Sequence, residues 1–283
     1  MFEVGPVSLI AASARRELAF ALAEQAAVPT SFPGISRWAP DHLRLIVVKD
    51  GAALRRRGGR PVPEWGVGFA FPGVNTIIIR ADALDPSGAL RHELAHLALH
   101  WKIRGRVPLW FDEGYAVVAA REFGRMLALQ LNLAVATRGV KDLGQLNQAL
   151  RAGEREAQAG YALAGSAVSH LIRLQPTRTL DRLLNRLAEG IPFEAALLEV
   201  SGYNLAQFER SWREDIRSRY GLIVWFAAGG WVALVAALVV GAGIYRRRRD
   251  APRREALNVG WPMPDPDLDH DVGPQLDQRQ PDS

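Results

Sequence analysis

The sequence of 283 residues predicts an α+β protein with a small N-terminal mixed sheet, a helical second half and then one membrane-spanning helix. The runs Arg44–Lys49 and Thr76–Arg80 are rich in β-branched residues and bounded by turn residues, which is typical of strands. Between residues 122 and 220, leucine and alanine recur at helical spacing. Three segments follow from these patterns: a folded domain over residues 1–220, a transmembrane helix over 222–245 and a tail over 246–283.

A further strand and a series of helices complete the expected domain. The first strand is expected at Met1–Val4. The helices of the second half are expected at Arg121–Arg138, Gln145–Ala152, Tyr161–Leu174, Thr179–Glu189, Phe193–Ser201 and Leu205–Arg219.

The helix that follows the sheet has a clear start. Asp85 or Ser87 is suited to cap it, and Pro86 is suited to its first turn. Apolar residues then recur along one face, at Leu90, Leu94, Leu97 and Ala98. This spacing predicts a helix of about four turns that is at least half buried.

This helix carries the pattern HExxH. His92 and His96 are four residues apart, so on a helix they share a face and can both bind one tetrahedral ion. Glu93 can reach a water on that ion and act as its general base. The pattern favours a zinc-dependent hydrolase, the alternative being a core helix with two structural histidines. His100 is expected behind the ligands or on the surface.

A catalytic zinc ion needs a third protein ligand, and the segment Pro108–Ala116 offers one. A helix with HExxH followed by W-x-x-E-G-x-A resembles the gluzincin metallopeptidases, specifically the bacterial peptidase MA-like domains. The resemblance implies a zincin-like fold with Zn²⁺ held by His92, His96 and Glu113. The interval from His96 to Glu113 is slightly shorter than in the aminopeptidases of this clan. Asp112 points about 100° away on a helix, so it is the weaker ligand candidate and is interpreted as a helix-start carboxylate.

The resemblance also suggests how substrate and transition state are bound. The Gly-rich segment Trp65–Gly73 resembles the edge strand beside the gluzincin cleft, which would hold an extended peptide by main-chain hydrogen bonds. A plain hairpin without that role is the alternative. Tyr161 is the favoured oxyanion donor, because peptidase MA-like sequences commonly carry a tyrosine there. His170, Tyr115 and a purely structural Tyr161 remain alternatives.

Residues 222–245 carry no charge and are long enough to span a bilayer with some tilt. A buried helical hairpin broken at Gly229–Gly230 is the alternative. Arginines dominate after the segment, which places the tail in the cytoplasm and the catalytic domain outside. Residues 1–28 contain charges that a secretory signal would lack, so we expect either a leader upstream or a tail-anchored protein that faces the cytoplasm, and we favour the first. Disorder is expected from Asp250 onward.

Composition narrows the remaining classes. The absence of cysteine excludes disulfides, Cys-ligated zinc and a thiol nucleophile. The net charge of +5 does not indicate nucleic-acid binding, because six arginines flank the apolar segment, where anionic lipid is the natural partner. The run Arg55–Arg60 is interpreted as an exposed loop near the cleft.

These patterns lead to one hypothesis and one alternative. The hypothesis is a membrane-anchored, single-pass zinc metallopeptidase that cleaves peptide or protein substrates with a zinc-activated water and Glu93 as general base. The alternative is a catalytically silent, membrane-tethered binding or scaffold protein with the same fold. No pattern in the sequence defines cleavage specificity or oligomeric state.

Overall fold

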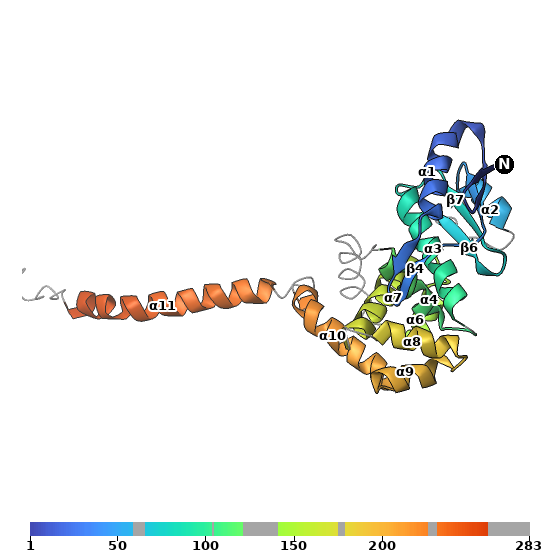
Figure 1. The fold of residues 1–283 in the computed structure, drawn as a ribbon. Helices are drawn as coiled ribbons and strands as arrows, with labels where there is room; N and C mark the ends of the chain where they lie inside the picture. The colour runs from blue at the N-terminus through green and yellow to red at the C-terminus, as the bar shows by residue number, and fades with distance from the viewer. Residues whose placement is uncertain (59–65, 104, 121–140, 175–178, 226–230, 260–283) are drawn as a thin grey trace, which may run out of the picture. The chain divides into compact units, whose positions relative to one another are not determined.

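The computed structural model shows two compact units, Met1–Ala228 and Gly229–Ser283. The described residues are 1–58, 66–103, 105–120, 141–174, 179–225 and 231–259 (Figure 1). In the first unit the sheet and the helices that cover it lie at one end, and the helices that follow α3 lie at the other.

Five strands form one mixed sheet in the order β1-β2-β5-β7-β6. The three central strands are parallel, and each edge strand is antiparallel to its neighbour. The strands predicted at Met1–Val4, Arg44–Lys49 and Thr76–Arg80 are confirmed to within one residue at each end. The strand bounds are Phe2–Val4 (β1), Val7–Ala11 (β2), Leu43–Val48 (β5), Gly68–Phe71 (β6) and Thr76–Arg80 (β7).

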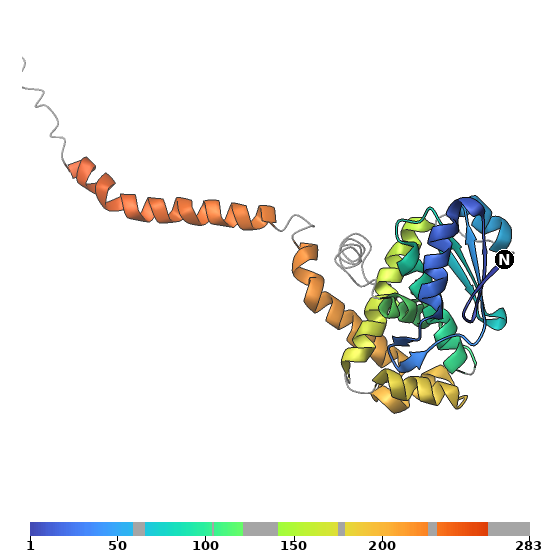
Figure 2. The same ribbon diagram turned by 45° about the horizontal axis from the view of Figure 1, so that its top comes forward.

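Helices cover both faces of this sheet (Figure 2). Side chains alternate along β5, so Leu45 and Val47 face the core that contains α1 (Arg16–Ala27) and α3 (Pro86–Lys102). Ile46 and Val48 face the other way and pack with Leu54 of α2 (Gly51–Gly58). The prediction of an exposed loop near the cleft at Arg55–Arg60 is therefore confirmed in its exposure for Arg55–Arg57 but wrong in the loop and its position: these arginines lie on α2, behind the sheet from α3. Residues 59 and 60 lie outside the described residues.

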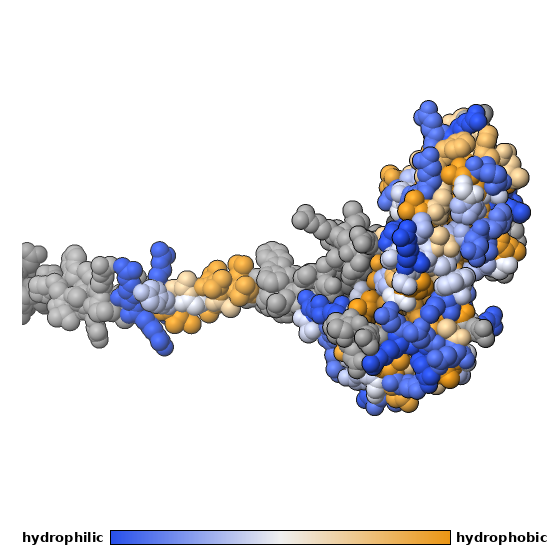
Figure 3. Space-filling view, in the orientation of Figure 1, coloured by the Kyte–Doolittle hydropathy of each residue, from blue (hydrophilic) through white to orange (hydrophobic). Residues whose placement is uncertain are grey.

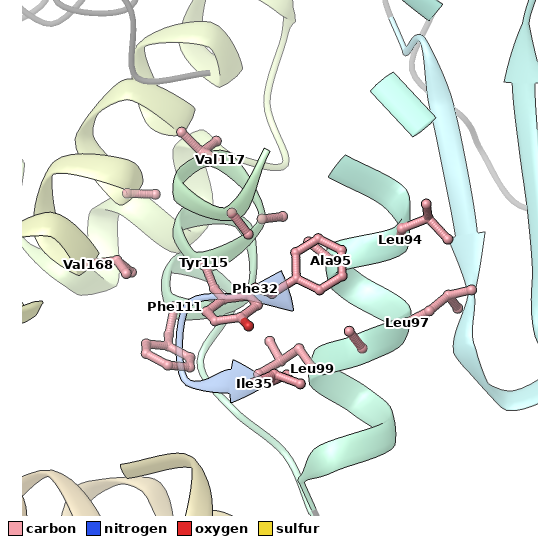
Figure 4. Close-up of a cluster of buried hydrophobic side chains, with 14 of the residues drawn as sticks. Phe32, Ile35, Leu94, Ala95, Leu97, Leu99, Phe111, Tyr115, Val117 and Val168 are labelled. Atoms are coloured by element: carbon pink, nitrogen blue, oxygen red, sulfur yellow. The ribbon is translucent and has the colours of Figure 1, made fainter. Parts of the chain in front are cut away.

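A small hairpin packs beside α3 and was not predicted from the sequence. Its strands are Thr30–Phe32 (β3) and Ile35–Trp38 (β4). Gly34 between them has φ 74°, and a Cβ there would lie 2.9 Å from a methyl of Leu184. Figure 4 shows Phe32 and Ile35 among the buried side chains of α3 and α4. The hairpin is short and irregular, so it lacks the strand periodicity that sequence patterns detect.

The two helices that carry the sequence motifs begin as the sequence indicates. The Asp85 side chain caps α3 by accepting a hydrogen bond from the Gly88 amide at 2.9 Å, and Pro86 occupies the first turn. The second motif lies on α4 (Leu109–Ala119). A Cβ at Gly114 would overlap the carbonyl oxygen of Ala164, so the glycine lets α4 lie closely against α7.

The second half of the first unit is helical, as predicted. The helix expected at Arg121–Arg138 lies outside the described residues. One helix begins at Glu154 instead of Tyr161, and another continues to Trp225, past the end of the predicted domain. The bounds are Leu143–Ala149 (α6), Glu154–Leu174 (α7), Thr179–Ala188 (α8), Phe193–Ser201 (α9) and Leu205–Trp225 (α10).

The second unit contains α11 (Trp231–Val259). Large apolar side chains are exposed along its first half, and Arg246–Arg249 follow them (Figure 3). The disorder expected from Asp250 is therefore wrong as far as Val259, because the helix continues through these residues. Among the helices that the structure describes, none is both long and apolar enough to cross a membrane.

Candidate metal centre

Three potential metal ligands from two helices converge on one point. His92 and His96 project from α3, and Glu113 projects from α4. The nearest Glu113 oxygen, Oε2, lies 3.6 Å from His92 Nε2 and 3.5 Å from His96 Nε2. One ligand atom from each residue can be chosen so that all three atoms lie within 4.8 Å of one another.

These separations fit a tetrahedral metal ion. Ligand atoms at zinc-like bond lengths of about 2.0–2.1 Å stand roughly 3.4 Å apart around a tetrahedron. Two of the measured separations are close to that value. Imidazole nitrogens and a carboxylate oxygen are also a common donor set for zinc. The side chains of His92 and Glu113 are 14% and 19% exposed, so solvent reaches the cluster.

Asp112 lies directly behind these ligands and binds two histidines. Its Oδ1 is 2.7 Å from His96 Nδ1, and its Oδ2 is 2.9 Å from His100 Nε2. Although burial raises the pKa of Asp112, hydrogen bonds from the two histidines lower it more, so the carboxylate is ionised and can only accept. Each facing ring nitrogen must therefore carry a proton. A neutral His96 then keeps its proton on Nδ1 and presents a lone pair on Nε2.

The cluster without a metal ion is an array of paired charges. Burial lowers the pKa of His96, but hydrogen bonds to Asp112 and Glu113 raise it well above the ordinary value of 6.5. Burial raises the pKa of Glu113, but hydrogen bonds with His92 and His96 lower it to about 2. A metal ion that binds here therefore displaces a proton held by His96.

Glu93 lies beside the cluster in a different environment. It is the next residue along α3 from His92 and is only 7% exposed. Burial raises the pKa of Glu93, while the nearby His92 and His96 and, less strongly, the backbone of Ala70 on β6 oppose this rise. A carboxylate with a raised pKa holds a proton more strongly than an ordinary glutamate. This property suits a general base.

The structure separates the three candidates for the oxyanion donor. The half-buried ring of Tyr161, from α7, stands edge-on to His92 with ring centroids 6.3 Å apart. The Tyr115 hydroxyl instead donates to the Pro33 carbonyl at 2.9 Å, which ties α4 to the β3–β4 hairpin. His170 is buried against α10, with Nε2 3.1 Å from the Ser211 hydroxyl. Of these three residues, Tyr161 is the one in contact with the metal cluster.

Comparison with known families places these residues in one superfamily. Residues 61–218, more than half of the chain, match the family described as the Peptidase MA superfamily. The chain belongs to the Peptidase MA superfamily. No curated protein gives a significant match to this sequence.

The matched region of this Peptidase MA chain contains β6, α3, α4 and α7, and so includes every residue of the cluster. Peptidase MA proteins are typically zinc-dependent, which agrees with the donor set. Sequence interpretation missed the partners of these residues: Asp112 as acceptor for two histidines, and Gly68 and Ala70 beside Glu93. The spacing of His96 and His100 was the available signal, because two histidines four apart on one helix face can share a partner.

Removing one acceptor from Asp112 should weaken metal binding. In Asp112→Asn the amide oxygen still accepts but the amide nitrogen cannot, so one histidine loses its partner. We expect zinc affinity to fall by about 10–100-fold, and by less in His100→Gln. Competition with a chromophoric chelator measures both values. Asp181→Asn, at an exposed position on α8, is the matched control. Wild-type affinity in Asp112→Asn would contradict a positioning role.

Zinc affinity should rise with pH beyond the range of an ordinary histidine. Because the pKa of His96 is raised, a proton competes with the metal at pH values above 6.5. Each displaced proton weakens apparent affinity by up to about tenfold for every pH unit below that pKa. Calorimetry in buffers of different ionisation enthalpy should record proton release on binding at neutral pH. Binding without proton release would show that His96 is already neutral.

Proposed function

We propose that this Peptidase MA chain is a zinc-dependent metallopeptidase of the gluzincin type. The observation that carries the proposal is the convergence of His92, His96 and Glu113, with Glu93 held beside them. Superfamily membership supports a peptidase-like hydrolase, and the donor set supports zinc. Solvent access to the cluster favours an enzyme over a scaffold with a filled cleft.

Each residue of the site has a separate role in the proposed peptide hydrolysis. When bound, zinc supplies a Lewis acid that acidifies a water molecule and polarises the substrate carbonyl. Glu93 accepts a proton from the attacking water and later delivers it to the leaving amine. Asp112 holds His96 in the tautomer that leaves Nε2 free. Tyr161 donates a hydrogen bond to the developing oxyanion.

The substrate of this proposal is a peptide in extended form. Within the described sheet, β6 pairs with β7 alone, so its second edge is unpaired. The strand also contacts α3, which carries the base and two ligands. A peptide that pairs with this edge would lie across the cluster and bring a main-chain carbonyl to it.

Substitution of Glu93 and of Glu113 should separate catalysis from metal binding. Glu93→Gln keeps the size of the side chain but removes the base, so we expect one zinc per chain and a loss of activity of about 10²–10⁴-fold. Glu113→Ala removes a ligand and should lose zinc together with activity. Elemental analysis and cleavage of a mixed peptide library, both on the full chain, measure these effects. Glu194→Gln, at an exposed position on α9, is the matched control.

The outcomes distinguish the enzyme from the alternatives. Full activity in Glu93→Gln would exclude Glu93 as the base. Unchanged zinc in Glu113→Ala would exclude Glu113 as a ligand. A wild-type protein that binds zinc but cleaves no peptide would favour the scaffold alternative, and a wild-type protein that binds no zinc would overturn the proposal.

The same proposal places this peptidase on a membrane, anchored once through residues 222–245. The exposed apolar side chains in the first half of α11 support an anchor, because no described residue of the second unit covers them. Arg246–Arg249 follow them, as expected for the cytoplasmic end of an anchor, with the catalytic domain on the other side. Anionic lipid would be the partner of these arginines.

Vesicle flotation tests the anchor. The full chain should float with neutral phosphatidylcholine vesicles and stay bound in high salt, because burial of apolar side chains does not depend on charge. A chain that ends at Trp225 should remain in the soluble fraction. If the full chain binds only anionic vesicles and salt releases it, the arginines hold it at the surface and the spanning helix is wrong.

A further inference from the structure

The general base of the proposed peptidase is in contact with a glycine of the sheet. A Cβ added to Gly68 would lie 2.9 Å from Oε1 and 3.0 Å from Cγ of Glu93, and 2.7 Å from Cδ1 of Ile79. Atoms that are not bonded to one another do not approach so closely, so something would have to move. Ile79 is fully buried in the core, so we expect the Glu93 carboxylate to move rather than the Ile79 side chain.

The main chain of the same strand also acts on this carboxylate. The Arg80 amide donates to the Val67 carbonyl at 3.1 Å, and Gly68 and Ala70 stand opposite Ile79 and Ile77. Antiparallel partners alternate between bonded and non-bonded pairs, so the main-chain groups of Gly68 and Ala70 point to the free edge of β6. The Ala70 amide points away from β7, and the backbone of Ala70 opposes the rise in the pKa of Glu93.

We propose that β6 positions the general base, because Gly68 leaves the space that the Glu93 carboxylate occupies. Gly68 is a positioning residue, and the inference rests on the proposed function. Within the described sheet, no strand pairs with the main-chain groups of Gly68 and Ala70 on this edge. A peptide paired with this edge is held by the same strand that positions Glu93. The strand therefore fixes the position of the substrate relative to the general base.

Gly68→Ala in the full chain tests this inference. We expect the added methyl to displace Glu93 and to spare the metal ligands, because the three atoms nearest to it belong to Ile79 and Glu93. Zinc content should stay as in wild type, while kcat for a peptide substrate falls by about 10–100-fold and KM changes less, because misplacement of a catalytic group slows chemistry rather than binding. The control is Gly241→Ala on α11, in the second unit, where an added Cβ also meets nothing within 4 Å. It should keep wild-type kcat.

Two double variants separate the base from the core. In the Glu93→Gln background, Gly68→Ala should cause little further loss, because the displaced group is already inactive. Ile79→Val removes the Cδ1 that the new methyl would meet, so Gly68→Ala with Ile79→Val should fold well and still have low kcat. Recovery of kcat in that variant would show that core packing was the cause, and it would overturn the inference.

The controls also distinguish the two proposals. If the wild-type chain binds zinc and is active, and Gly68→Ala has the same kcat, the inference is overturned. The proposed peptidase function is not affected by that result. An equal loss from Gly68→Ala in the wild-type and Glu93→Gln backgrounds overturns it as well, because the effect would not act through Glu93. A wild-type chain without hydrolysis overturns the proposed function and this inference with it.

Discussion

The close approach of α4 to α3 is the constraint on which the rest of the site depends. Two consecutive residues of α4 face α3, and the next residue faces α7. Asp112 binds His96 and His100, and Glu113 faces His92 and His96. Gly114 points elsewhere and lets α4 lie against α7 without a clash at Ala164. Because successive residues on a helix point about 100° apart, one short segment can meet two neighbouring helices.

The pKa values of three carboxyl groups in this site shift in different directions because their partners differ. Each is substantially buried, and burial alone raises the pKa of a carboxyl group. Histidine partners outweigh burial at Asp112 and Glu113, and lower their pKa values. At Glu93 burial outweighs the neighbouring histidines and the backbone of Ala70, so its pKa is raised. Carboxyl groups whose environments shift their pKa values in opposite directions are suited to different roles. Here Glu113 is suited to binding the metal ion and Glu93 to proton transfer.

The features that the sequence predicted are those that depend on neighbours along the chain. The pairing of His92 with His96 follows from helical geometry, and β7 follows from a β-branched run between turns. The partners of Glu93 and Asp112 depend on how β6 and α4 pack against α3, and local patterns contain no such distance. The helix α2 was missed because its run of arginines, followed by glycines, is typical of an exposed loop. The apolar run Leu45–Val48 of β5 could have indicated this helix. A strand that is buried on both faces needs a helix on each side of the sheet.

The position of β6 explains why a four-residue strand can serve both the core and the site. Phe69 and Phe71 pack on the side of the sheet that α2 covers, and this anchors the strand without using its free edge. Gly68 and Ala70 alternate with them and face α3, where a larger side chain at Gly68 would displace Glu93. An unpaired edge is normally a risk of aggregation, which short strands reduce. Here the strand has only four residues, and its first residue, Gly68, lies against the Glu93 carboxylate of α3.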